Sequence, residues 1–185
     1  MAHKRRPMFY TFKEAARGGA YDEMPMLPAG IDPQLHLSRN EADQPFWLIL
    51  EKDSVLVQMS GAARVEMRDG PVLWEDIVPG DFLYIPGGTP HRIKPKEPSV
   101  MYRFKAEQAG LEAVAWYCEQ CHAQLYRRLW DTAQELPQDG YQKSCLEFNS
   151  HVQHRTCGAC GTVHPDIKLN DYRWTAIAAE LKSPA

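Results

Sequence analysis

Short runs of mostly apolar residues, several of them alternating with polar ones, follow one another between residues 34 and 106. They are rich in β-branched and aromatic residues, and turn signals such as EKDS at 51–54 and RDG at 68–70 separate them. Alternation with a period of two is typical of strands buried on one face. The eight predicted strands are QLHLS (34–38), PFWLIL (45–50), VLVQMS (55–60), ARVEM (63–67), VLWEDIV (72–78), DFLYIP (81–86), HRIKP (91–95) and VMYRFKA (100–106). Strands at this spacing predict an all-β sandwich or barrel.

The segments around these strands carry weaker patterns. Residues 8–19 predict a short helix ended by the glycine pair at 18–19, and the proline-rich stretch 21–34 reads as a loop. A helical crossing is expected at 106–115. A C-terminal helix is predicted over 171–182, with Asn170 as its N-cap.

Charge and hydropathy narrow the classes of partner. The chain has 185 residues, a formal net charge of −3 and a single short basic run at 3–6, so no nucleic-acid partner is expected. No apolar stretch approaches the roughly 20 residues of a membrane span, and the N-terminal residues show no signal-peptide pattern. A cytoplasmic protein without a membrane partner is therefore predicted.

Four of the five cysteines form two CxxC pairs, Cys118 with Cys121 and Cys157 with Cys160. Four thiolates from two such turns make a closed tetrahedral metal site, for which iron and zinc are both suitable. A closed site leaves no position for substrate, so its expected role is to stabilise a segment too small to fold on its own. Cys145 is predicted to be an ordinary free thiol.

The strongest signal within the strands is GDFLYIPGGTPH at 80–91. Its Gly80, Pro86, Gly88 and His91 match the second motif of the cupin superfamily. The motif predicts that His91 points into a barrel, where a neutral imidazole can bind a metal or serve as a hydrogen-bonded core residue.

With this motif and the four cysteines together, the chain resembles the bacterial 3-hydroxyanthranilate 3,4-dioxygenases over about residues 30–165. The resemblance is carried by WYCEQC at 116–121, ELP at 135–137, Phe148 and RTCGACGTVHP at 155–165. It implies an all-β cupin (double-stranded β-helix or jelly-roll) barrel with a small rubredoxin-like metal-binding tail and a few short helices. The predicted divisions are an N-terminal extension packing on the barrel (1–29), the barrel (30–112), the four-cysteine tail (113–165) and a C-terminal extension (166–185).

The same resemblance implies Fe(II)-dependent ring opening, but this sequence departs from the family's metal ligands. Of the family's two histidines and one glutamate, only His91 remains, because Leu48 and Ser54 occupy the positions of the other two. The family's carboxylate-binding arginine falls at Gln44, and a pocket glutamate falls at or near Arg103. Because two of the three ligands are replaced, the barrel cannot hold Fe(II) in the family's usual way. His36 with Glu41 or Glu51 could instead supply ligands in a shifted geometry.

Two main hypotheses follow. The first is a ring-cleaving dioxygenase, or a descendant of one, acting on a small aromatic carboxylate. The second is a cupin without catalytic metal that binds an aromatic acid or performs acid/base chemistry through His91. A third is an assembly protein that the metal stabilises and that has no chemistry in its pocket. The candidate catalytic residues are His91, His36 and Arg103, and the candidate substrate-binding residues are Gln44, Trp47 and Arg92. A homodimer is also expected.

Overall fold

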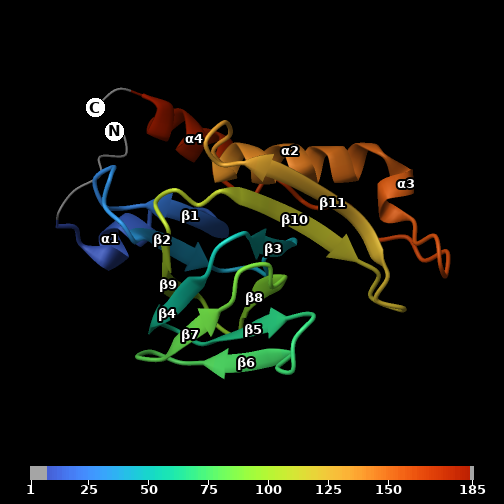
Figure 1. Ribbon diagram of the computed structural model, residues 1–185, viewed down its shortest axis with the longest axis horizontal. Helices are drawn as coiled ribbons and strands as arrows, with labels where there is room; N and C mark the ends of the chain where they lie inside the picture. The colour runs from blue at the N-terminus through green and yellow to red at the C-terminus, as the bar shows by residue number, and fades with distance from the viewer. Residues whose placement is uncertain (1–7, 184–185) are drawn as a thin grey trace.

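A computed structural model describes residues 8–183 and shows two antiparallel sheets that face each other, with helices along one side (Figure 1). Residues 1–7, which hold the basic run at 3–6, and residues 184–185 lie outside the described range. The elements in that range are α1 (Thr11–Ala15), β1 (Tyr21–Pro25), β2 (Gln34–Asn40), β3 (Trp47–Leu50), β4 (Ser54–Ser60), β5 (Ala63–Met67), β6 (Trp74–Ile77), β7 (Phe82–Ile85), β8 (His91–Pro95), β9 (Ser99–Lys105), β10 (Leu111–Tyr117), β11 (Gln124–Asp131), α2 (Pro137–Ser150), α3 (Val152–Arg155) and α4 (Trp174–Lys182).

The strand pairing is that of one long hairpin folded back on itself. β5 pairs with β6, β4 with β7, β3 with β8 and β2 with β9, and successive pairs alternate between the two sheets. The first sheet has the order β1-β2-β9-β4-β7 and the second β11-β10-β3-β8-β5-β6. This nesting is the jelly-roll topology of cupins. The predicted all-β cupin fold is therefore confirmed.

All eight predicted strands are present, as β2 to β9. β4, β5 and β9 alternate between buried and half-buried residues, because one face of each packs on the core between the sheets. The loop prediction for 21–34 is wrong at its start, where β1 pairs with β2 along the sheet edge. All five residues of β1 are buried, so it shows no alternation.

The predicted helix at 106–115 is also wrong. Residues 111–117 form strand β10, which pairs with β3 on one side and β11 on the other. β10 and β11 extend the second sheet well past the barrel, and the turn that joins them holds Cys118 and Cys121 (Figure 1). Trp116 and Trp130 point from these two strands into the main core.

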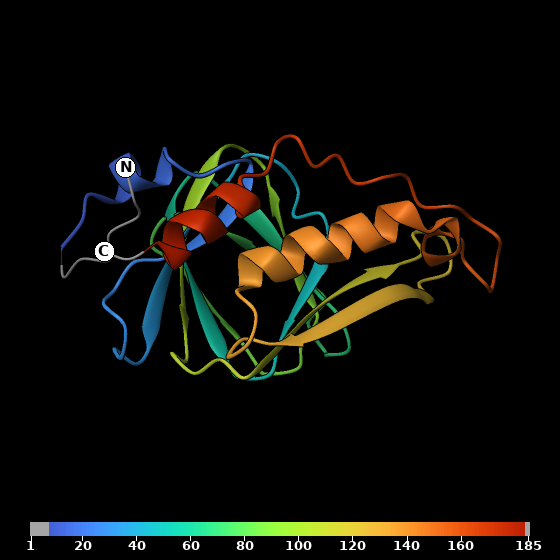
Figure 2. The ribbon, with the colours of Figure 1, turned by 90° about the horizontal axis from the view of Figure 1, so that it is seen from above.

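Helix α2 was not predicted, and it lies along the inner face of β10 and β11 (Figure 2). Its Tyr141, Cys145 and Phe148 are fully buried, and the Phe148 ring stacks on Trp116 with centroids 4.2 Å apart. Few of its residues are strongly apolar, so the helical period is hard to detect from sequence. Burial nevertheless follows a helical spacing.

The terminal helices were predicted with partial success. α1 confirms the short helix expected within 8–19. α4 confirms a C-terminal helix, but it begins at Trp174, so the prediction of Asn170 as its cap is wrong. No helix between residues 8 and 183 is both long enough and apolar enough to cross a membrane.

Candidate functional site

The inner face of the barrel brings together the residues at the positions discussed for the family's metal site. His91 on β8 is directly opposite Leu48 on β3, and both are fully buried. Arg103 on β9 and Ser54 on β4 reach the same place from the other sheet. Alternation along each strand puts these side chains on the inner face.

The Arg103 guanidinium occupies the centre of this group. Its Nη1 lies 2.9 Å from His91 Nε2 and donates to Ser54 Oγ at 3.2 Å, and its Nε donates to Glu23 Oε1 at 2.8 Å. Arg103 is 0% exposed and Glu23 1%. A buried arginine with a carboxylate partner stays charged, so the centre of the barrel holds an organic cation.

The protonation state of His91 follows from these contacts. Its Nδ1 lies 3.0 Å from the carbonyl oxygen of Thr89 and donates to it, which leaves Nε2 to accept from Arg103. Burial, and then the Arg103 charge, lower the pKa of His91 to about 3. Burial alone would raise the pKa of Glu23, but Arg103 and then Lys105 outweigh it and lower this pKa. At neutral pH the imidazole is therefore uncharged and Glu23 is ionised.

These residues do not fit a catalytic iron. The one histidine nitrogen available to a metal already accepts from a guanidinium, and a metal cation beside that charge would be repelled. Between residues 8 and 183, the only group of three or more histidine, cysteine or acidic side chains close enough to hold an ion is the four-cysteine set. Neither Glu41 nor Glu51 therefore completes a ligand group with His36.

Two further candidates lie in or near the barrel with other partners. The Gln44 side chain hydrogen-bonds to the backbone of β8. Its Oε1 accepts from Ile93 N at 3.1 Å, and its Nε2 lies 3.4 Å from the His91 carbonyl oxygen. His36 lines a separate cavity of about 140 Å³ at the end of the barrel, beside the buried ion pair of Lys105 with Glu112 at 2.6 Å. His91 is not among the residues that line this cavity.

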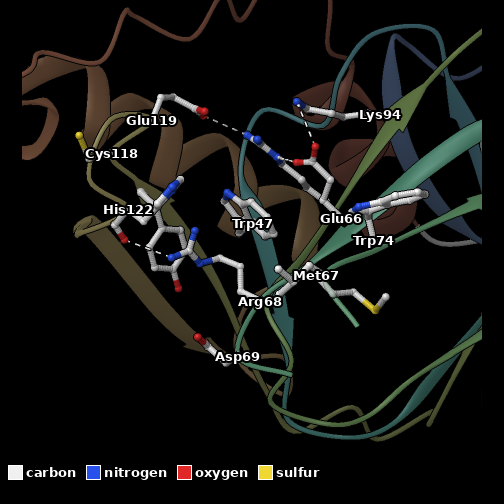
Figure 3. A pocket seen from close by; sticks show the side chains of 13 residues that line it. Trp47, Glu66, Met67, Arg68, Asp69, Trp74, Lys94, Cys118, Glu119 and His122 are labelled. Atoms are coloured by element: carbon white, nitrogen blue, oxygen red, sulfur yellow. Dashed lines mark hydrogen bonds and ion pairs between the residues drawn. The ribbon is translucent and has the colours of Figure 1, made fainter. Parts of the chain in front are cut away.

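Trp47 and Arg92 lie on the opposite face of the second sheet, outside the barrel. There they line a pocket of about 590 Å³, within the roughly 300–1,000 Å³ typical of small-molecule sites. We call it the outer-face pocket (Figure 3). Its lining residues are Trp47, Glu66, Met67, Arg68, Asp69, Leu73, Trp74, Arg92, Lys94, Tyr117, Cys118, Glu119 and His122.

The charges in the outer-face pocket are only partly paired. Arg92 contacts Glu66 at 2.6 Å and Glu119 at 3.3 Å, and Lys94 also contacts Glu66. Arg68 has no carboxylate oxygen within 4 Å among residues 8–183, and its buried Nε has no hydrogen-bond partner there. Its guanidinium lies over the Tyr117 ring, 3.9 Å from the centroid, and 5.3 Å from that of Trp47. A cation held against aromatic rings can bind an anion.

The four cysteines converge as predicted, at the far end of β10 and β11. Cys118 Sγ lies 3.5 Å from Cys160 Sγ, Cys121 Sγ lies 3.4 Å from Cys157 Sγ, and all four sulfurs are within 4.8 Å of one another. A tetrahedron with metal–sulfur bonds of about 2.3 Å has edges of about 3.8 Å. The set therefore fits one Zn or Fe ion, held by these four thiolates.

Each cysteine pair sits in a turn of the same design. The residue after the second cysteine is left-handed, His122 with φ 62° and Gly161 with φ 76°. Its N–H donates to the carbonyl oxygen of the first cysteine, at 2.9 Å for His122 and 2.8 Å for Gly161. The contacts of Cys160 with Thr162 lower the pKa of that thiol to about 6, which favours the thiolate that a metal requires. Cys145, by contrast, is a buried free thiol, and burial raises its pKa.

Sequence reasoning missed two residues of these sites. Glu23, the partner of Arg103, lies in the stretch read as a loop, and no local pattern places it in the barrel. Arg68 directly follows β5 and is the first residue of the predicted turn at 68–70, where a solvated charge is the ordinary expectation. Its place on the period-two face shared with Glu66 was the available signal.

Comparison with curated proteins gives relatives of a single name. The chain is 30% identical over 115 residues to a 3-hydroxyanthranilate 3,4-dioxygenase of Jannaschia sp. (strain CCS1), covering 58% of this chain and 61% of that protein. It is 26% identical over 122 residues to one of Bacillus thuringiensis (strain Al Hakam), covering 62% and 65%. The resemblance predicted from the sequence is confirmed. The chain spans less than two thirds of the length of either relative.

Among solved structures, the chain is similar to hydroquinone 1,2-dioxygenase PnpCD in complex with Cd²⁺ and 4-hydroxybenzonitrile, with a TM-score of 0.46 and 17% sequence identity. The match covers 52% of this chain and 71% of that structure's chain. A cupin-2 domain protein from Shewanella frigidimarina gives 0.45 and 17%, covering 54% and 94%. No family model matches the chain.

Proposed function

We propose that this protein is a cupin that binds a small aromatic carboxylate without using a catalytic iron. The observation that carries the proposal is Arg68, an arginine without a carboxylate partner between residues 8 and 183, held against Tyr117 in a pocket of about 590 Å³. The names of the curated relatives include an aromatic carboxylate, which supports this class of ligand.

The pocket offers what an aromatic acid requires. The Arg68 guanidinium supplies paired N–H donors of the geometry that suits a carboxylate. Trp74, which is half-exposed, and Met67 supply apolar surface for the ring, and Lys94 adds a second cation at the rim. Trp47 orients the cations, since Arg92 lies 4.6 Å from its ring centroid.

The inner face of the barrel argues against oxygenation. The Arg103 guanidinium takes the position at His91 Nε2 that a metal requires. The lowered pKa of His91 also makes the imidazole a weak base, whose accepting nitrogen is already occupied. Both iron chemistry and acid/base chemistry through His91 are thus disfavoured.

Calorimetric titration with 3-hydroxyanthranilate and with benzoate tests the proposal, with cyclohexanecarboxylate and benzamide as controls for the ring and the charge. Arg68→Met is expected to weaken benzoate binding about tenfold or more, since it removes a charge-assisted contact. Arg127→Met is the matched control, because Arg127 is an exposed arginine outside the pocket, on the same face as Tyr117. It is expected to bind benzoate as the wild type does.

Absence of saturable binding at millimolar benzoate and 3-hydroxyanthranilate would overturn the proposal. So would Fe(II)-dependent oxygen consumption with 3-hydroxyanthranilate that disappears in His91→Gln. The homodimer and the cytoplasmic location stay predictions, and sedimentation of the purified protein tests the first.

A further inference from the structure

We infer that the metal site forms part of the ligand site: residues 118–122, here called the knuckle loop, make one wall of the outer-face pocket, so that ligand binding requires the metal. This inference rests on the proposed function of the pocket. It gives the four-cysteine site a role in ligand recognition, beyond the stabilising role expected from its sequence.

Two contacts join the knuckle loop to the sheet face. Arg68 Nη2 donates to the backbone carbonyl oxygen of His122 at 3.1 Å, and Arg92 Nη1 lies 3.3 Å from Glu119 Oε1 (Figure 3). Cys118, Glu119 and His122 themselves line the pocket. Both arginines that face the pocket are thus oriented in part by the loop that carries two metal ligands.

Apart from its two cysteines and the two arginine contacts, the knuckle loop is held, among the described residues, only by local backbone hydrogen bonds, from Cys118 N to the Ala123 carbonyl at 2.8 Å and from His122 N to the Cys118 carbonyl at 2.9 Å. Residues 119–122 are exposed, and the Glu119 side chain is 60% exposed. His122 adopts a left-handed backbone conformation, which costs a non-glycine residue about 1–2 kcal/mol. A metal held by Cys118 and Cys121 would fix both ends of the Glu119 turn, and its bonds to Cys157 and Cys160 would connect this turn to the second one.

The position of the His122 carbonyl therefore depends on the metal. Without the metal, the turn is free to leave its left-handed conformation, and the carbonyl moves away from Arg68. Arg68 then loses the hydrogen bond that fixes its guanidinium over the Tyr117 ring. A charged group that is no longer preorganised binds an anion more weakly.

The experiment removes the metal from the side away from the pocket. Cys160→Ser changes a ligand that lies in the second turn and does not line the pocket. Metal content is measured by elemental analysis and benzoate affinity by calorimetry. The dissociation constant is expected to rise about tenfold or more. Chelator-treated wild type should behave alike and recover on addition of Zn²⁺, whereas Cys160→Ser should not. Cys145→Ala is the control for loss of a thiol that is not a ligand.

A second pair of variants keeps all four cysteines. His122→Gly allows the left-handed conformation, whereas His122→Val opposes it, and both remove the imidazole. Both should retain the metal; His122→Gly should bind benzoate more tightly than His122→Val, by about fivefold or more. This comparison decides the question if Cys160→Ser does not fold.

Unchanged benzoate affinity in folded, metal-free protein would overturn the inference and leave the proposed function standing. Equal affinities of His122→Gly and His122→Val would also overturn it. Failure of the metal-loaded wild type to bind benzoate would instead overturn the proposed function.

Discussion

Replacing Arg103 by methionine tests whether the cation at the centre of the barrel is a required part of the fold. The change keeps most of the side-chain volume but removes the charge. Glu23, 1% exposed, then loses its nearest counter-charge, and His91 and Ser54 lose a donor. Lys105 remains as a more distant cation.

The expected loss is large, because a buried carboxylate is left without its partner. Breaking one side of such a pair costs about 3–5 kcal/mol, against a typical total stability of about 5–15 kcal/mol. In a chain of this size the melting temperature should fall by roughly 6–20 °C. The double variant Glu23→Gln with Arg103→Met removes both charges and should recover most of that loss.

The loss should also depend on pH with a definite sign. In the wild type, the lowered pKa of Glu23 contributes stability above its unfolded pKa and loses it as the pH falls. In Arg103→Met, burial raises the pKa of Glu23, so the folded state takes up a proton more readily than the unfolded state. The deficit of the variant should therefore shrink as the pH falls from about 8 toward 5.

Urea unfolding followed by circular dichroism, at several pH values, measures both effects. Arg64→Met is the control, since it breaks an exposed pair with Asp76 and should change stability far less. A deficit under about 1 kcal/mol near pH 8, or one independent of pH, would refute the reasoning about a buried, coupled pair.

Three other outcomes are expected. Because His91 has a folded pKa of about 3 against 6.5 when unfolded, its contribution to stability falls as the pH drops below about 6.5. Asp22, with its pKa raised from 3.8 to about 6, has the opposite effect on stability over that range. The difference in urea unfolding between the wild type and His91→Gln therefore isolates the contribution of His91. Elemental analysis should find about one Zn or Fe per chain, lost in Cys157→Ala together with faster hydrogen exchange in the C-terminal third. Gly140→Ala should lower the free energy of unfolding by roughly 1–3 kcal/mol, because its Cβ would lie 2.5 Å from the Trp130 ring, even though alanine favours helices. An unchanged melting temperature would contradict this.

The sequence by itself determined the barrel strands and the four-cysteine site. Short runs rich in β-branched and aromatic residues, bounded by turn signals, identified β2 to β9. The two CxxC pairs identified the metal ligands, because their spacing is local and the chemistry needs only those four thiols. β1 was missed because its segment, YDEMP, contains two acidic residues and a proline although all five residues are buried.

Only the tertiary structure decided which face of each strand is inside and what meets there. Period two places Trp47 and Leu48 on opposite faces, but the packing of the two sheets puts Leu48 in the barrel and Trp47 in the outer-face pocket. The pairing of Arg103 with Glu23 joins residues 80 positions apart, and no local pattern encodes such a distance. The absence of two metal ligands was readable from the sequence, whereas the guanidinium at His91 Nε2 is a product of long-range packing.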